Sequence, residues 1–119
     1  ELRDPGVAAA LDRGYEATLR QYARYAPSFM LDRFDVDVYE HNEAFASASC
    51  AVAQEVGIPD DRFNLHGGAV SLGHPLGASG TRCLITLLGV MRRIEAASGI
   101  VTLCLGGGNA VAMYVTRDV

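Results

Sequence analysis

The 119-residue sequence has no long apolar run and no block of basic residues. A membrane-spanning helix needs roughly 20 consecutive apolar residues, and a surface for nucleic acid or an anionic membrane needs clustered lysine or arginine. The net charge is −4. We therefore expect neither nucleic acid nor a membrane as a partner. No targeting segment is visible, which favours the cytoplasm or an organellar matrix.

Cysteine is scarce as well. The three cysteines, Cys50, Cys83 and Cys104, are far apart and form no C-x-x-C pair. This distribution argues against a disulfide scaffold and against a cysteine-rich zinc site, so we expect a reducing compartment and no metal. Half of the residues are hydrophobic and 20% are charged, which is typical of a globular chain, and the length allows one domain.

Helical and strand patterns alternate along the chain, which predicts an α/β layered sheet with right-handed crossovers and an antiparallel last strand. The expected order is a helix from Pro5 to about Tyr25 ended by Pro27, a strand over 35–39, a helix from Asn42 to about Val56, a short strand over 62–66, a glycine-rich loop over 67–80, a helix ending near Ala97, and a hairpin of strands 99–105 and 110–116. The segment 81–91 is apolar around most of its helical circumference. Because one small sheet covers only one face of a helix, we expect a second domain or partner chain on the other.

Three motifs carry residues suited to chemistry. Asn42 lies where a strand gives way to a helix, so it either caps that helix or positions a water or carbonyl oxygen at the sheet edge. Glu43 would suit the first turn of the same helix. His74 lies between Gly73 and Pro75, which leave its imidazole reachable, and a neutral imidazole can accept a thiol proton or donate to an oxyanion.

The third motif places Cys104 at a strand end, followed by three glycines, 106–108. It is either a thiol beside exposed backbone N–H donors or a buried cysteine before a flexible turn. Cys50 and Cys83 lie in apolar helices and are interpreted as small hydrophobic residues. The glycines do not form a dinucleotide fingerprint or a Walker loop.

Taken together, NEAFA at 42–46, NLHGGAVSLGHPLGASG at 64–80 and CLGGG at 104–108 resemble the thiolase family, specifically its C-terminal domain. The resemblance covers about residues 35–117, and residues 1–34 match more loosely, so residues 1–119 are interpreted as one thiolase C-terminal domain. It implies thiolytic cleavage of a 3-oxoacyl-CoA or the reverse Claisen condensation of two acyl-CoA molecules. Coenzyme A and acyl-CoA would be substrates, with no permanently bound cofactor.

The resemblance also implies roles for single residues. His74 would help to generate the thiolate of the nucleophilic cysteine and contribute to an oxyanion hole. Asn42 would hold the water that completes this hole. Cys104 would be the acid/base at the α-carbon of the attacking acetyl group, and the Gly106 backbone N–H would belong to a second oxyanion hole.

Two departures from the family pattern predict a missing part. Nothing in the sequence corresponds to the family's nucleophilic cysteine, and no strand precedes Pro5 where the family's C-terminal half begins with a strand expected to be central in its sheet. We therefore expect an N-terminal thiolase half or a partner subunit, in a homo- or hetero-oligomer. The alternatives are a non-catalytic thiolase-fold assembly or regulatory module and a related condensing enzyme such as a ketoacyl synthase, for which a different histidine pattern is expected.

Overall fold

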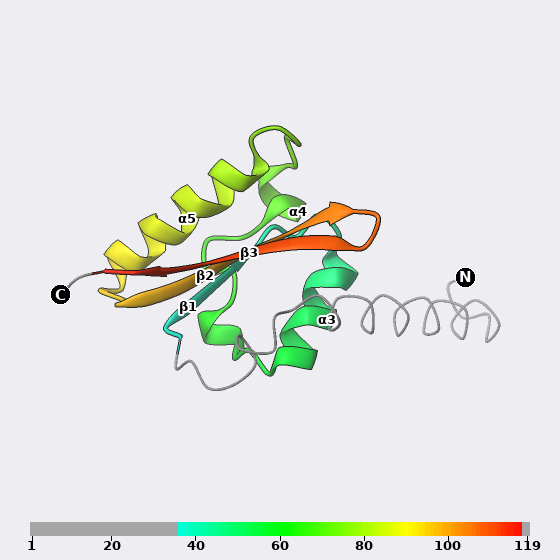
Figure 1. The fold of residues 1–119 in the computed structure, drawn as a ribbon. Helices are drawn as coiled ribbons and strands as arrows, with labels where there is room; N and C mark the ends of the chain where they lie inside the picture. Colours follow the sequence, from blue (N-terminus) through cyan, green and yellow to red (C-terminus); the bar gives the residue numbers. More distant parts are fainter. Residues whose placement is uncertain (1–35, 118–119) are drawn as a thin grey trace.

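The computed structural model describes residues 36–117, so the helix expected before Pro27 lies outside the described residues. A three-stranded sheet forms the centre of this part of the chain (Figure 1), with β1 (Val38–His41), β2 (Ser98–Gly106) and β3 (Asn109–Thr116) in the order β1-β2-β3. β1 and β2 are parallel, whereas β2 and β3 are antiparallel. The predicted α/β fold and its antiparallel last strand are confirmed.

Helices lie on both faces of this sheet. The crossover from β1 to β2 contains α3 (Ala46–Val56), the 3-10 helix η1 (Asp60–Arg62), α4 (Ala69–Leu72) and α5 (Ser79–Arg93). Figure 1 shows α5 against one face of the sheet and α3 on the opposite side. α3 ends at Gly57, which adopts the left-handed conformation that favours glycine (φ 73°). The predicted end of this helix is therefore confirmed.

Several predicted element bounds are wrong. The strand expected over 35–39 is β1 at Val38–His41, and the helix expected from Asn42 begins at Ala46. Residues 62–66 form no strand, because Asp60–Arg62 turn as a 3-10 helix and Asn64 has a positive φ of 47°, which leaves only an isolated parallel bridge between Phe63 and Tyr39. α5 ends at Arg93 rather than near Ala97, because the chain reverses at Glu95 (φ 57°). The Asp37 carboxylate then accepts the backbone N–H groups of Ala97 and Ser98, both at 2.9 Å, at the start of β2.

The hydrophobic core lies between α5 and the sheet. Its buried members come from α5, β1, β2 and the turn after α5 and are Val38, Cys83, Leu87, Val90, Met91, Ala96 and Val101. Gly99 of β2 allows the close approach of the helix, since a Cβ atom there would lie 2.8 Å from Leu87 Cδ1 and 3.0 Å from Met91 Sδ. The side chains of alternate strand residues point to opposite faces of a sheet. The side chains of β1 that point toward α5 are therefore those of Val38 and Glu40, and the side chain of Asn42, just after the strand, continues this alternation.

The three described strands are contiguous, because β2 pairs with β1 on one side and with β3 on the other.

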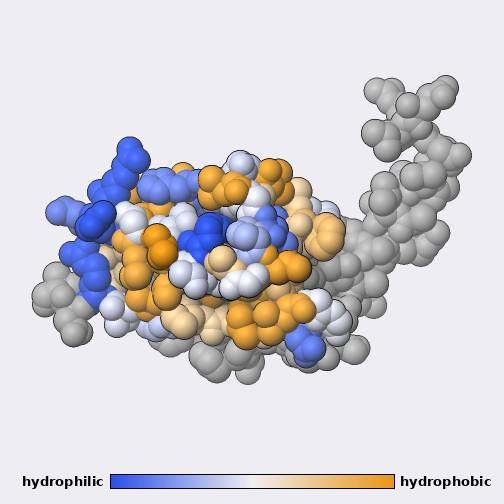
Figure 2. Space-filling model, turned by 90° about the horizontal axis from the view of Figure 1, so that it is seen from above, coloured by the Kyte–Doolittle hydropathy of each residue, from blue (hydrophilic) through white to orange (hydrophobic). Residues whose placement is uncertain are grey.

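Apolar side chains also reach the surface, where Figure 2 shows hydrophobic areas interrupted by polar ones. On α5, Ile85 and Leu88 are 65% and 45% exposed, on the side of the helix away from the core. The prediction that one sheet covers only part of this helix is confirmed. No helix within residues 36–117 is long and apolar enough to cross a membrane.

Candidate functional site

Asn42 follows the last residue of β1 and is completely buried. Its backbone N–H donates to Thr102 O of β2 at 2.9 Å, and its backbone oxygen accepts from Ala69 N of α4 at 2.9 Å. α3 begins at Ala46, with Phe45 as its N-cap and no capping side chain. The hypothesis that Asn42 caps this helix is therefore wrong, and its side chain is available for other contacts.

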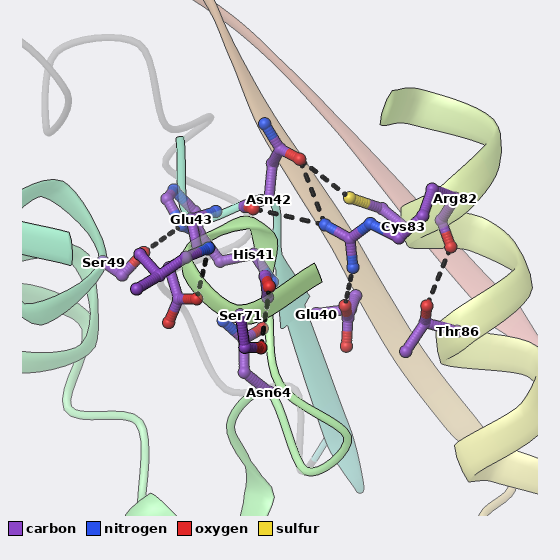
Figure 3. Close-up of polar contacts among 12 residues, drawn as sticks. Glu40, His41, Asn42, Glu43, Ser49, Asn64, Ser71, Arg82, Cys83 and Thr86 are labelled. Atoms are coloured by element: carbon purple, nitrogen blue, oxygen red, sulfur yellow. Dashed lines mark hydrogen bonds and ion pairs between the residues drawn. The ribbon is translucent and has the colours of Figure 1, made fainter. Parts of the chain in front are cut away.

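The Asn42 carboxamide oxygen accepts from two donors on α5 (Figure 3). Arg82 Nη2 lies 3.1 Å from Oδ1, and Cys83 Sγ lies 3.5 Å from it. Burial raises the pKa of the Cys83 thiol to about 11, so the thiol keeps its proton and remains a donor. The interpretation of Cys83 as a buried residue is confirmed, and its thiol in addition contacts the Asn42 side chain. The same interpretation is wrong for Cys50, which is exposed on α3.

The carboxamide nitrogen faces His74, with Asn42 Nδ2 3.4 Å from His74 Nδ1. His74 itself is exposed, and its Nδ1 lies 2.6 Å from Ser79 Oγ at the start of α5. Ser79 Oγ also lies 3.1 Å from Pro75 O, and the single hydroxyl proton can serve only one of these acceptors. The Asn42 NH₂ group can only donate, so His74 Nδ1, which it faces, is the acceptor. A neutral imidazole in this site therefore carries its proton on Nε2.

Glu40 lies next to the Asn42–His74 pair, because it precedes Asn42 by two residues and its side chain points to the same face of the sheet. Its carboxylate is buried and forms an ion pair with Arg82, with Oε1 2.7 Å from Nη1. Burial raises the pKa of the Glu40 carboxyl to about 7, although the Arg82 charge acts in the opposite direction. The same guanidinium contacts the Asn42 backbone oxygen at 3.2 Å, so Arg82 joins β1, the loop after it and α5.

A second polar cluster lies on the opposite face of β1, toward α3. The His41 ring is buried, with Nδ1 2.7 Å from Ser49 Oγ, and it accepts the backbone N–H of Glu43 at 3.1 Å. Burial lowers the pKa of His41 to about 4, so its ring is neutral at pH 7.

Glu43 is not in the first turn of α3 as expected. It precedes that helix with a φ of 61°, and its Oε2 accepts Val70 N at 3.2 Å. Gly68 is required beside it, since a Cβ atom at residue 68 would lie 2.6 Å from Glu43 Cβ. The contact holds the segment that leads to His74.

Cys104 and Gly106 lie at the carboxyl end of β2, the strand next to β1. Cys104 is partly buried, and the pairing with β3 is irregular between Cys104 and Gly106. Residues 106–108 all have positive φ, a conformation that favours glycine. The predicted turn between the two hairpin strands is confirmed. Leu103 packs against the core under α5, so alternation along β2 directs Cys104 to the other face of the sheet.

The structure therefore brings Asn42 and His74 together and places Cys104 and Gly106 at the same edge of the sheet. No hydrogen bond found within residues 36–117 joins Cys104 to the Asn42–His74 pair. The roles of these four residues remain predictions. In the same part of the chain, no group of three or more His, Cys, Asp or Glu residues is arranged to hold a metal ion.

Comparison with known proteins identifies the family. The family described as "Thiolase, C-terminal domain" matches residues 26–117. The chain belongs to the thiolase family. It is 53% identical over 83 residues to the cytosolic acetyl-CoA acetyltransferase of Rattus norvegicus, which covers 70% of this chain and 21% of the relative. The acetyl-CoA acetyltransferase of Escherichia coli is 47% identical over the same length and the same shares.

A solved thiolase structure agrees with the fold. The crystal structure of the Bacillus anthracis acetyl-CoA acetyltransferase superposes with a TM-score of 0.65 and 40% identity, over 67% of this chain and 20% of that one. The chain thus spans about a fifth of the length of the thiolases that it matches.

Sequence reasoning missed Glu40, Arg82 and Ser79 in this site. Glu40 carried a detectable signal, because it lies two residues before Asn42 in a strand and must share its face. Arg82 and Ser79 carried none, because their contacts with Asn42 and His74 depend on how the first turns of α5 pack against β1.

Proposed function

We propose that this chain is the C-terminal catalytic part of a thiolase, which transfers an acyl group to or from coenzyme A. The observation that carries the proposal is the contact between Asn42 and His74 at the carboxyl edge of the sheet, together with the thiolase relatives. The substrates would be a 3-oxoacyl-CoA with coenzyme A, or two acyl-CoA molecules in the condensing direction. The relatives' names contain acetyl-CoA, which supports a short acyl group, and one relative is described as cytosolic.

His74 would contribute to two stages of this chemistry. It would help to generate the thiolate of the nucleophilic cysteine, as the thiolase resemblance implies. With its proton on Nε2, it can donate to a thioester oxygen, beside the N–H donors of Asn42 or a water that they hold. Both groups therefore act on the thioester carbonyl.

Cys104 would act on a different atom. Enolate formation requires a base at the α-carbon, and the backbone N–H of Gly106 would donate to the oxygen where charge collects. A substrate lying across the edge of the sheet would meet the Asn42–His74 pair on one side and Cys104 on the other. The nucleophilic cysteine would come from the N-terminal thiolase half, either in the same polypeptide or in a partner subunit.

The test is to combine the chain with a complementary N-terminal thiolase half and to measure thiolysis of acetoacetyl-CoA. We expect no turnover by the chain alone, turnover by the combination, and a loss in Cys104→Ser on the order of 100-fold or more, as for other general acid/base groups. Cys50→Ser is the matched control, because this cysteine is exposed on α3 and has no proposed role. Equal turnover in the two variants would favour a non-catalytic module of the same fold.

A further inference from the structure

The side chain of Arg82 donates to three acceptors, which are Glu40 Oε1 and the backbone and side-chain oxygens of Asn42. These contacts restrict the orientation of the Asn42 carboxamide. We propose that Arg82 and Glu40 are positioning residues that fix which way the Asn42 carboxamide faces, so that its NH₂ group is turned toward His74. The inference rests on the proposed function for its catalytic meaning, but the orientation can be measured independently of any activity.

The orientation follows from the donors that surround the amide oxygen. Arg82 Nη2 and Cys83 Sγ both approach Oδ1, at 3.1 and 3.5 Å. A guanidinium has only donors to offer, and the buried thiol is protonated. A carboxamide rotated by 180° would therefore direct its own NH₂ group at two donors. With the oxygen held in this way, Nδ2 points to His74, 3.4 Å from Nδ1.

Glu40 restrains the guanidinium in turn. Its Oε1 accepts from Nη1 at 2.7 Å, while Nη2 contacts both oxygens of Asn42. The planar guanidinium is thus held on two of its nitrogens and cannot rotate away from Asn42 without breaking the ion pair. Figure 3 shows this chain of contacts, which runs from Glu40 through Arg82 to the Asn42 oxygen.

Stability is a weak explanation for this buried ion pair. Removing a carboxylate from water is costly, and well-packed apolar residues of similar volume often serve a fold equally well. One oxygen of this carboxylate, Glu40 Oε2, is buried without a hydrogen-bond partner among residues 36–117, as is Arg82 Nε. The ion pair leaves these two polar atoms unsatisfied, yet it aligns Nη1 and Nη2 of Arg82 with three acceptors. Orientation of the Asn42 side chain explains this arrangement better than stability does.

The first test measures the orientation itself by NMR of the isotope-labelled chain. We expect a nuclear Overhauser effect between the Asn42 side-chain NH₂ protons and the His74 ring protons. Arg82→Lys should remove it, because one ammonium group cannot reproduce the guanidinium contacts, whereas Arg92→Lys, an exposed arginine in the last turn of α5, should retain it. Persistence of the effect in Arg82→Lys would overturn the proposal. If Arg82→Lys does not fold, Glu40→Gln, which preserves side-chain shape, is judged by the same criterion.

The second test asks whether Arg82 acts through Asn42, with kinetics of the combined thiolase halves. We expect Arg82→Lys to lower kcat on the order of 100-fold with little change in KM, as expected for a misplaced reacting group. In an Asn42→Ala background the same substitution should change kcat less than about twofold, because the amide that it positions is gone. Equal losses in the two backgrounds would mean that Arg82 has a general structural role. Absence of turnover in the unmodified combination would refute the proposed function and leave the NMR result to decide the orientation.

Discussion

His41, the residue before Asn42, shows how a single side chain can couple this region to pH. Its ring nitrogen Nδ1 accepts the Glu43 N–H and lies against Ser49 Oγ, so a proton on Nδ1 would face a donor. Burial lowers the pKa of His41 from 6.5, its value in an unfolded chain, to about 4 in the folded chain. The stabilising contribution is therefore complete above about pH 6.5 and is lost as the pH falls toward 4.

This linkage gives a prediction for His41→Asn, in which the amide oxygen replaces Nδ1 as the acceptor. Between pH 7 and pH 5, the free energy of unfolding should fall by about 2 kcal/mol more in the unmodified chain than in the variant. Urea titration at the two pH values measures the difference. The comparison cancels the opposite contribution of Glu40, which is present in both proteins. Identical pH dependence of the two proteins would show that His41 does not bind protons differently on folding.

At the scale of single residues, the sequence predicts which residues belong to the site better than it predicts which side chains they contact. Asn42 and His74 stand in recognisable motifs, and the structure brings them together. The sequence allows Asn42 to be either a helix cap or a ligand-positioning amide, and only the position of Phe45 at the start of α3 excludes the cap. The contribution of Arg82 is decided by tertiary packing, which no local pattern encodes.

Among the elements, the contact between α5 and β2 determines where the first turns of α5 lie relative to β1. Gly99 allows this contact, because a Cβ atom there would push against the ends of the Leu87 and Met91 side chains. These ends can shift, so Gly99→Ala should lower the free energy of unfolding by about 1 kcal/mol, the low end of the cost of overpacking.

Gly89→Ala provides the matched control on α5. A Cβ atom at residue 89 would meet nothing within 4 Å, so the substitution should stabilise the helix by up to about 1 kcal/mol. Denaturant unfolding of the two variants checks both signs. Similar changes in the two would contradict the close packing at Gly99.

Elements with strong local signals were predicted well. The hairpin of β2 and β3 and the end of α3 at Gly57 follow from glycine positions and alternation. The expected strand at 62–66 failed, because the acidic turn at Asp60–Arg62 and the left-handed Asn64 outweigh the strand pattern. The α5 boundary failed for a similar reason, since an apolar pattern that extends past Arg93 conceals the reversal at Glu95.

For the molecule as a whole, the exposed apolar side of α5 predicts self-association of the isolated chain. Ile85 and Leu88 present apolar surface to solvent on the face away from the sheet. Burial of such surface is favourable by about 25 cal/mol per Å². We therefore expect the apparent mass of the chain to rise with concentration in light scattering.

The matching variant is Ile85→Glu, which places a charge on this face without entering the core. It should reduce association and leave the helical circular dichroism signal unchanged. Thr81→Glu, at an exposed position in the first turn of the same helix, controls for the added charge. A chain that is monomeric at all concentrations before substitution would refute this expectation.

Asn42 connects more of the molecule than its position in a loop would indicate. Its backbone bonds to β2 and α4, and its side chain bonds to α5 and lies beside His74. The end of β1, the stretch from α4 to His74, α5 and β2 thus meet at one amino acid. Any partly unfolded form that loses one of these segments also loses the geometry of the others around it, so competence for chemistry at this edge should vanish before the sheet itself melts.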